Sequence, residues 1–446
     1  MLSLPSLQTC ALALSISEEP VFSAISEYKS LVDELDFENI LKHINFFSSL
    51  KTRVTGYPSF YNASSYIKSE FANLNITTEV QEFEVAVPLD EGSTIEVHLS
   101  NGSKVILKAH SLWPNLIQTC KTPPEGIEGE LIYAGCGKLS EFNNLRVENS
   151  IVLLKFNSGD GWLNAVKLGA KAVIFMGLTE NTTYYEVRSK FLQVPLYFPR
   201  LYVSVEDGLF LKKMVEEAKE SGIPCKVVIK NQMEYRLVKA ENIIGIIPGE
   251  ISDEIIVIAA HYDSWSVVPS ISPGADESTA ISTLLELARI YSNRRPRRTL
   301  WLVALSGHYQ ALAGAREFVE KYYFSNEVQN DKKKILLFIG LDFSTDEEAL
   351  GVLYAGHFYM STSAVRVASR WNWLRGQIFN EYLPKIEESL NQDFTVEDGL
   401  YGETGWWASI PRSFILDSEP AAISHGLSIT LRTSRSYRDL WGTPLD

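Results

Sequence analysis

The sequence predicts an α/β fold with a mixed central β-sheet flanked by helices, and the stretch from Ile255 to Ala315 is the most informative. The run IIVIAAHYDS is short, continuous and apolar, as expected of a buried parallel strand. An amphipathic helix follows from about Ser278 to Tyr291, and TLWLVALSG reads as a second apolar strand. A strand, a crossover helix and a second strand form a βαβ unit, which is typical of α/β sheets.

Polar side chains lie at the ends of these strands. His261 and Asp263 end the first strand, Asp276 precedes the helix, and His308 follows the second strand. The run KKKILLFIGLDFS is a third apolar strand, which ends in Asp342. Ligands of such sheets bind outside the carboxyl ends of the strands. We therefore expect the chemistry of this protein at this edge of the sheet.

Composition sets limits on the class of protein. A chain of 446 residues is long enough for two or three domains with a sizeable core. Its hydrophobic content of 45% and charged content of 22% are those of a soluble globular protein. The net charge of -14 argues against nucleic acid or an anionic membrane as a main partner. The sequence contains no apolar run near the roughly 20 residues that a membrane helix needs, so we expect no transmembrane segment.

The four cysteines, Cys10, Cys120, Cys136 and Cys225, are widely spaced and include no Cys-x-x-Cys pair. This spacing excludes a structural zinc knuckle. A bridge between Cys120 and Cys136 is one interpretation, and free thiols at both positions are the one we favour.

The first 20 residues have some features of a secretory signal. They are apolar and contain an Ala-x-Ala pattern, but no Lys or Arg precedes it, so a signal and an ordinary segment are both open. Sequons at Asn62, Asn75, Asn101 and Asn181 are compatible with glycosylation. We therefore expect an extracellular or cell-surface location.

Three motifs in this order resemble peptidase family M28, the zinc aminopeptidases and carboxypeptidases. They are AHYDS, PGADES at the start of a helix, and RRTLWLVALSG before a loop. TRVTGYPS, with Arg53 and Gly56, and ENIIGIIPGE also fit the family pattern. The resemblance implies an M28 fold, with residues 21–90 and 236–446 in the peptidase-like domain. Family members usually continue beyond the element matched by WGTPLD, so we expect a truncated carboxyl end.

Residues 91–235 change to short strands and turns and resemble a protease-associated (PA) domain. The resemblance rests on IYAGCG, SIVLL and GAKAVIF. It implies an inserted, mostly β domain that covers the peptidase site as a lid. A domain that acts only as a spacer is the alternative.

The M28 resemblance implies a site with two zinc ions bridged by one carboxylate. His261 matches the first ligand, Asp276 the bridging carboxylate and Asp342 the third ligand of one ion. Asp263 matches the acid that holds the histidine ring. Three such ligands leave one position for a water, which a metal ion acidifies.

The second half of the site departs from the family pattern. In SGHYQALAGA, His308 and Tyr309 stand where the family has two glutamates, one the general base and one a ligand of the other ion. Gly442 replaces that ion's histidine. A neutral tyrosine is a poor ligand and glycine has no side chain to offer. We therefore expect one zinc ion at most, at His261, Asp276 and Asp342.

Three roles remain open for His308: general base to a metal-bound water, fourth ligand of a closed zinc site, or a polar residue of an inactive site. The resemblance implies an M28-like metal-dependent exopeptidase with reduced activity on peptides or protein termini. The alternative is an inactive relative that binds peptides, self-associates or assembles with partners. Weaker candidates for the site are Glu277, His357, His425, Arg432 and Thr433.

Overall fold

The structure is a computed structural model of the whole chain. It describes residues 29–179, 181–345, 350–353, 356, 373–374, 376–391, 396–397, 414–433 and 438–446. Internal contacts divide the chain into two units, residues 1–35 with 372–393, and residues 36–371 with 394–446. In the smaller unit, the π-helical turn η3 (Ile378–Tyr382) leads into α11 (Leu383–Leu390). Apart from a helical stretch at residues 29–33, which also belongs to the smaller unit, all other elements named below belong to the larger unit.

A mixed β-sheet forms the centre of the larger unit. Its described strands run in the order β1-β9-β11-β10-β12-β15-β13-β14. The neighbours β11, β10, β12 and β15 are parallel, whereas β1, β9 and β11 pair antiparallel. The predicted α/β class with a mixed sheet is confirmed. The strands are β1 (Thr77–Asp90), β9 (Met233–Ile247), β10 (Ile251–His261), β11 (Arg298–Leu305), β12 (Lys334–Asp342), β13 (Leu350–Leu353), β14 (Val396–Glu397) and β15 (Ser428–Thr433).

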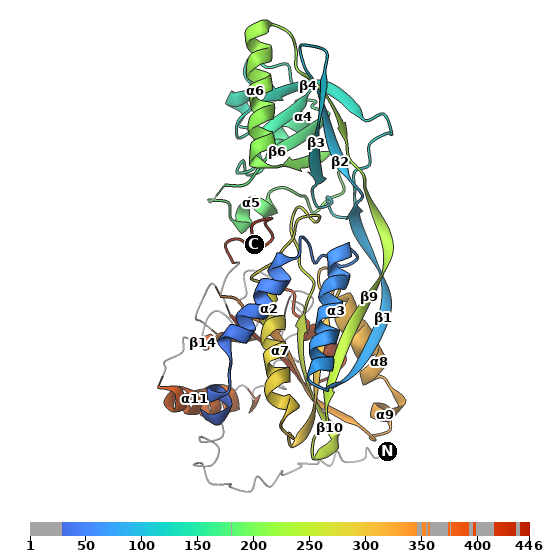
Figure 1. Cartoon of the computed structure of the whole chain (residues 1–446), viewed down its shortest axis with the longest axis vertical. Helices are drawn as coiled ribbons and strands as arrows, with labels where there is room; N and C mark the ends of the chain where they lie inside the picture. The colour runs from blue at the N-terminus through green and yellow to red at the C-terminus, as the bar shows by residue number, and fades with distance from the viewer. Residues whose placement is uncertain are drawn as a thin grey trace, which may run out of the picture. The chain divides into compact units, whose positions relative to one another are not determined.

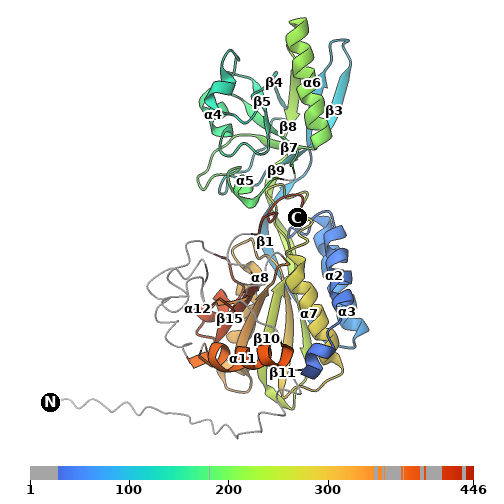
Figure 2. The ribbon, with the colours of Figure 1, turned by 90° about the vertical axis from the view of Figure 1, so that its left-hand side faces the viewer.

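Helices cover both faces of this sheet (Figure 1 and Figure 2). On one face lie α2 (Phe37–Ser49), α3 (Pro58–Asn73) and α7 (Ser278–Ser292), and α7 is the predicted crossover between β10 and β11. On the other face lie α8 (Ala313–Tyr323) and α12 (Glu419–Ile423), with the short α9 (Asn326–Gln329) after α8. The βαβ unit expected from the sequence is present.

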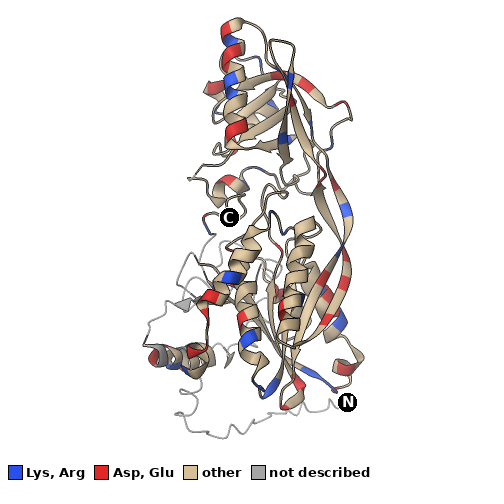
Figure 3. Ribbon diagram, in the orientation of Figure 1, with Lys and Arg blue, Asp and Glu red and all other residues tan. Residues whose placement is uncertain are grey.

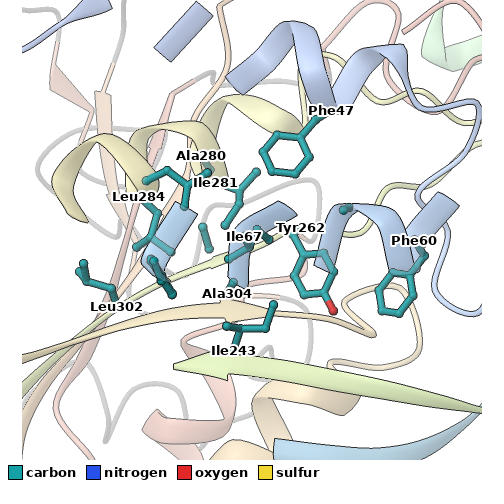
Figure 4. Packing of buried hydrophobic residues seen from close by; sticks show 14 of the residues in the cluster. Phe47, Phe60, Ile67, Ile243, Tyr262, Ala280, Ile281, Leu284, Leu302 and Ala304 are labelled. Atoms are coloured by element: carbon teal, nitrogen blue, oxygen red, sulfur yellow. The ribbon is translucent and has the colours of Figure 1, made fainter. Parts of the chain in front are cut away.

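Side-chain alternation along the strands builds a separate core on each face. In β11, Leu302 and Ala304 pack with α2, α3 and α7, whereas Trp301 and Val303 pack with α8. Successive residues of a strand point to opposite faces, so one apolar run serves both cores. Figure 4 shows the first core, in which Phe47 from α2 lies among side chains of α7 and the sheet.

The amino-terminal helix is broken where the sequence predicted continuity. We expected one helix from Glu27 to Leu50, but residues 29–33 form one helical stretch and α2 begins at Phe37. Asp36 has an extended backbone, and its side chain accepts a hydrogen bond from Asn39 N at 3.2 Å. An aspartate in this position caps a new helix, because its carboxylate satisfies a free amide of the first turn.

A closed barrel occupies the inserted segment. Its strands run in the order β2-β3-β7-β6-β5-β4-β8, between Ser93 and Lys230. The long helix α6 carries both acidic and basic side chains along its length (Figure 3). The strands are β2 (Ser93–His98), β3 (Lys104–Ser111), β4 (Ile127–Tyr133), β5 (Ile151–Lys155), β6 (Ala172–Met176), β7 (Arg200–Val203) and β8 (Lys226–Lys230); the helices are η1 (Leu139–Phe142), α4 (Trp162–Lys167), α5 (Tyr184–Arg188) and α6 (Val205–Ser221).

Cys120, Cys136 and Cys225 are free thiols in the structure, and Cys10 lies outside the described residues. Burial raises the pKa of Cys120 and raises that of Cys225 to about 11, so both stay protonated near neutral pH. None of the helices in the described part of the chain is both long and apolar enough to cross a bilayer.

Candidate functional site

The parallel strands deliver the site residues to one edge of the sheet. His261 is the last residue of β10 and Asp342 the last of β12, while His308 follows β11 by three residues. The next residue after His261, Tyr262, points into the first core, where its ring stacks on Phe60 at 5.1 Å (Figure 4). The buried tyrosine therefore fixes the strand end and turns His261 away from that core.

His261 and His308 form a stacked pair that shares one carboxylate. Their ring centroids are 4.0 Å apart with the planes 25° from parallel. His261 Nδ1 lies 3.2 Å from Asp417 Oδ2, and His308 Nδ1 lies 3.0 Å from both oxygens of Asp417. All three side chains are buried, and His261 Nε2 has no hydrogen-bond partner among the described residues.

Electrostatics favour a charged carboxylate in this cluster. Burial alone would raise the pKa of Asp417, but the two histidines outweigh it and hold that pKa far below its usual range. Burial likewise opposes protonation of His308, yet the charge and hydrogen bond of Asp417 raise the His308 pKa above its ordinary value. An ionised carboxylate only accepts hydrogen bonds, so each Nδ1 carries the hydrogen.

A second cluster joins the two aspartates expected to bind metal. The guanidinium of Arg438 lies between them, with Nε 3.0 Å from Asp276 Oδ2 and Nη2 2.7 Å from Asp342 Oδ1. Arg432 makes a further ion pair with Asp342. Asp276 Oδ1 also accepts from Ser344 Oγ at 2.6 Å. Both carboxylates are thus neutralised by arginine.

Glu277, beside Asp276, is satisfied by three donors. Trp265 N donates to it at 3.0 Å, Trp441 Nε1 at 2.7 Å, and the Tyr309 hydroxyl donates as well. Burial and the charge of Glu277 raise the pKa of Tyr309 well above its ordinary value, so this hydroxyl remains a donor. The tyrosine therefore serves the glutamate and presents no anionic oxygen to a metal.

Gly442 lies against an indole that fills the space of the missing histidine side chain. Its φ is +76°, and a Cβ built on it would lie 2.3 Å from Trp265 Cζ3. Gly442 O accepts from Val267 N at 2.9 Å, which holds the two segments together. Only glycine fits this conformation and this distance without movement of the tryptophan.

The loop that carries Asp276 is held by a fully buried arginine. Arg53 donates to Tyr262 O at 3.1 Å and to Gly274 O at 2.9 Å, and also to Phe47 O at 3.1 Å. Gly274 has a φ of +59°, a left-handed conformation that glycine adopts without strain. Arg53 thus ties the end of α2 to β10 and to the loop that starts α7.

A cavity of about 120 Å³ lies between the histidine cluster and the arginine cluster, and residues of both clusters line it. The barrel segment closes one side of it: Tyr184 of α5 stacks on Trp441 at 4.7 Å, and its amide donates to Asp439 O at 2.8 Å. Trp113 N donates to Val267 O at 2.7 Å, a second contact between the two segments. The role of the barrel as a lid or a spacer stays a prediction. The cavity is lined by Tyr184, His261, His308, Tyr309, Asp342, Phe414, Ile415, Arg432, Arg438 and Trp441.

The structure groups the expected site residues differently from the predicted ligand set. His261 is joined to His308, whereas Asp276 and Asp342 are joined to Arg438. Asp263 accepts from Thr55 Oγ1 at 2.9 Å and from His308 N at 3.1 Å, with no hydrogen bond to the His261 ring among the described contacts. The metal and catalytic roles of these residues stay predictions.

Sequence reasoning missed Asp417 and Arg438. Neither belongs to a motif: Asp417 is 109 residues from His308, and Arg438 is 96 from Asp342. Of the weaker candidates, Arg432 lines the cavity, His425 is exposed beyond α12 and does not line it, and His357 lies outside the described residues.

Residues 242–404 match the model of peptidase family M28. This segment belongs to peptidase family M28. It contains His261, Asp276, His308 and Asp342, while Asp417 and Arg438 lie beyond the matched residues.

Curated relatives of the M28 segment include peptidases. The chain is 23% identical to carboxypeptidase Q of Xenopus laevis over 290 residues, which are 59% of this chain and 58% of that protein. It is 32% identical to a probable zinc metalloprotease of Pyricularia oryzae over 91 residues, 19% of this chain and 18% of that protein. The chain thus spans less than two thirds of the length of either relative.

Two solved structures of peptidases share the fold. A zinc aminopeptidase from Bacillus subtilis superposes with a TM-score of 0.52 at 18% identity, over 91% of this chain and 88% of that one. A peptidase M28 precursor from Shewanella amazonensis gives 0.52 at 13% identity, over 92% and 86%. At these identities the two likenesses show the fold.

The residues of this chain, as placed, do not fit the two-ion site of the family. Asp276 and Asp342 are neutralised by Arg438, Tyr309 is bonded to Glu277, and Gly442 has no side chain. A single ion at His261, Asp276 and Asp342 stays a prediction, and it would have to displace the guanidinium.

Proposed function

We propose that this chain is an M28 relative that binds a peptide or protein terminus without hydrolysing it. The observation that carries this proposal is the guanidinium of Arg438 between Asp276 and Asp342. An arginine side chain stays protonated at every physiological pH, so these carboxylates have a permanent counterion. A guanidinium neutralises charge but, unlike a metal ion, supplies no acidified water.

The remaining parts of the family mechanism are also weakened. Hydrolysis needs an activated water, a base to take its proton, and stabilisation of the tetrahedral intermediate. The base would have to be His308, whose Nδ1 faces Asp417. If the base and the second ion each contribute roughly 10²-fold, activity falls by about 10⁴-fold below a complete M28 site.

The cavity supports binding of a small terminal group. Its volume of about 120 Å³ is below the roughly 300 Å³ at which ligand pockets for drug-sized molecules begin. Aromatic rings of Tyr184 and Trp441 form one wall, and the ion-paired Arg432 and Arg438 line another part. Such a lining suits one end of a chain, with the rest of the peptide outside.

Hydrolysis assays test the catalytic part of the proposal. We expect no turnover of fluorogenic aminoacyl or carboxy-terminal peptide substrates, with or without added zinc, under conditions where the Bacillus zinc aminopeptidase is active. Turnover at about 1 s⁻¹ or faster that His308→Ala abolishes would establish a one-metal peptidase and overturn the proposal.

Tryptophan fluorescence tests the binding part. Short peptides with free ends should change the emission of the wild-type protein in a saturable way, and Trp441→Phe should remove that change. Trp301→Phe is the control, because Trp301 is buried in the second core and does not line the cavity, whereas the half-buried Trp441 does. No saturable change with any peptide, or a change that survives Trp441→Phe, would contradict binding at this cavity.

We also propose an extracellular or cell-surface location. The four sequon asparagines, Asn62, Asn75, Asn101 and Asn181, are all exposed. Expression in a glycosylating host should give a protein whose mass falls on treatment with an N-glycosidase. A secreted chain that carries no glycan at any of the four sites would remove this support.

A further inference from the structure

We propose that one divalent transition-metal ion, such as zinc, binds at His261, His308 and Asp417. This site shares only His261 with the ligand set that the family pattern implies. It does not depend on whether the protein cleaves peptides.

The donor set is of the right chemistry for such an ion. Imidazole nitrogen and carboxylate oxygen are the zinc ligands of many proteins, and three protein ligands leave a position for water or a bound group. In the described part of the chain these are the three residues whose potential ligand atoms all lie within 4.8 Å of one another. Each comes from a different segment: the end of β10, the loop after β11 and the loop before α12.

The spacing of the donor atoms fits tetrahedral coordination. Bonds of 2.0–2.1 Å at tetrahedral angles place neighbouring ligand atoms about 3.3 Å apart. The two Nδ1 atoms lie 3.2 and 3.0 Å from Asp417 Oδ2. A bound ion would take the place of the two hydrogens that the imidazoles share with Asp417.

The charge balance also leaves room for a cation here. Asp417 is buried, and its ion-pair partners among the described residues are the side chains of His261 and His308, a residue type that binds metal ions in many proteins. By contrast, Asp276 and Asp342 already have the permanent charge of Arg438. A metal ion that binds Asp417 has to displace only a hydrogen, which exchanges with solvent. A metal ion that binds Asp276 and Asp342 has to displace the guanidinium of Arg438, which is part of the chain.

Metal titration of the full chain tests the site. Protein freed of metal with a chelator should bind about one zinc ion per chain in competition with a chromophoric chelator. Cobalt in the same site should show the intense visible absorption of a tetrahedral environment. Zinc should also raise the unfolding temperature, because an ion that binds only the folded state stabilises it.

Two variants identify the ligands, and one is a matched control. Asp417→Asn keeps the shape of the side chain and an acceptor for Nδ1–H, but it removes the anionic ligand. His308→Phe keeps a ring against His261 without its nitrogens. Loss of a residue that only orients a ligand weakens metal binding by up to roughly 100-fold. Each of these two variants removes a ligand itself, so we expect zinc affinity to fall by about 100-fold or more. Asp342→Asn, equally isosteric, should change zinc affinity by less than about threefold.

The outcomes separate this site from the family site and from no site. Loss of zinc in Asp342→Asn with retention in Asp417→Asn would assign the ion to the family ligand set and overturn the proposal. Zinc bound equally by all three variants, or no saturable binding by the wild type, would also overturn it. Circular dichroism confirms that each variant is folded. Zinc binding without hydrolysis leaves the proposed function intact, and hydrolysis would contradict that function but not this site.

Discussion

The two charged clusters of the site differ in the kind of cation that neutralises their carboxylates. One is the guanidinium cluster, Arg438 with Asp276 and Asp342, and the other is the imidazole cluster, His261 and His308 with Asp417. Both lie at the same edge of the sheet; the imidazole cluster is buried, whereas in the guanidinium cluster Arg438 is buried and the side chains of Asp276 and Asp342 are 11% and 15% exposed. Arginine keeps its charge at any pH that a protein meets, whereas histidine gains and loses it near neutrality.

This difference shows two ways in which carboxylates at the edge of a sheet can be neutralised. Carboxylates left without a cation in a buried site are strongly destabilising. In the guanidinium cluster the chain itself supplies the missing charge, so no ion is needed. In the imidazole cluster the compensation is exchangeable, so protons or a metal ion can supply it.

The largest effect should come from removing the permanent cation. Arg438→Met keeps much of the side-chain length but leaves Asp276 and Asp342 with less compensation, and we expect a loss of about 3–5 kcal/mol in the free energy of unfolding. Arg236→Met is the control: Arg236 pairs with Glu91 at 2.8 Å, but its side chain is 48% exposed against 5% for Arg438. The control should cost much less, because exposed ion pairs contribute little to stability. Equal costs in urea unfolding would show that the guanidinium cluster is no more dependent on its cation than the surface pair.

A smaller effect should come from the wall beside the guanidinium cluster. Gly442→Ala places a Cβ against Trp265 Cζ3, so we expect the free energy of unfolding to fall by about 1–3 kcal/mol more than in Gly159→Ala. Gly159 also has a positive φ, +51°, but nothing lies within 4 Å of its Cβ position. The control therefore removes the cost of the backbone conformation. The same clash predicts that Gly442→His alone will not rebuild a metal site. Equal losses of unfolding free energy in Gly442→Ala and Gly159→Ala would show that Trp265 does not exclude a side chain at residue 442.

Tyr309 should matter less than either, because Glu277 keeps two other donors. Tyr309→Phe removes one hydrogen bond to a buried carboxylate, and we expect a loss of about 1.5 kcal/mol in the free energy of unfolding. Tyr61→Phe removes a bond to the carbonyl of Lys239 at an exposed position and should cost less. A gain of zinc binding by Tyr309→Phe would mean instead that the hydroxyl had been excluding a metal from Glu277.

The smallest effect should be the pH dependence of the imidazole cluster without metal. The His308 pKa is raised by Asp417 against the effect of burial, so its contribution is complete below about pH 6.5 and is lost as pH rises through the folded-state pKa. The Asp417 pKa is lowered, so its contribution is present above about pH 4 and is lost as pH falls through its folded-state value. The cluster should stabilise most between about pH 4 and 6.5.

We would measure the free energy of unfolding of the wild type and of Asp417→Asn with a chelator present. The difference between the two gives the contribution of the imidazole cluster to stability. It should be larger at pH 6 than at pH 8. Burial lowers the pKa of His43 and His110 to about 4, but these residues titrate in both proteins and cancel in the difference. A difference that is flat or rises from pH 6 to pH 8 would show that His308 does not hold a proton for Asp417.

The parts of the fold that depend on local sequence patterns were predictable. The βαβ unit from Ile251 to Leu305 follows from apolar runs and one amphipathic helix. The strand ends that carry His261 and Asp342 follow from the same runs. The break at Asp36 was not recognised, although aspartate is one of the residues preferred at the position directly before a helix.

The partners of the site residues depended on contacts across the whole fold and were not predictable from motifs. Asp417 and Arg438 reach the site from segments about 100 residues away in sequence from their partners. One signal was present: the chain keeps Asp276, Glu277 and Asp342 while losing metal ligands. Several acids at one site require a cation nearby, but Arg432, Arg435 and Arg438 all lie shortly before WGTPLD, so the sequence does not single out Arg438.

The long pairing of β1 with β9 bears on how this architecture can be altered by engineering. The two strands are in register from Thr77 opposite Ile246 to Asp90 opposite Met233, and the barrel begins at Ser93 and ends at Lys230. The entire barrel therefore takes the place of the turn in one antiparallel hairpin. A few turn residues joining Asp90 to Met233 could close that hairpin without changing its register, because loop length affects closure entropy only slowly. The inserted domain can therefore be replaced, and other domains whose termini lie close together could be inserted between Asp90 and Met233.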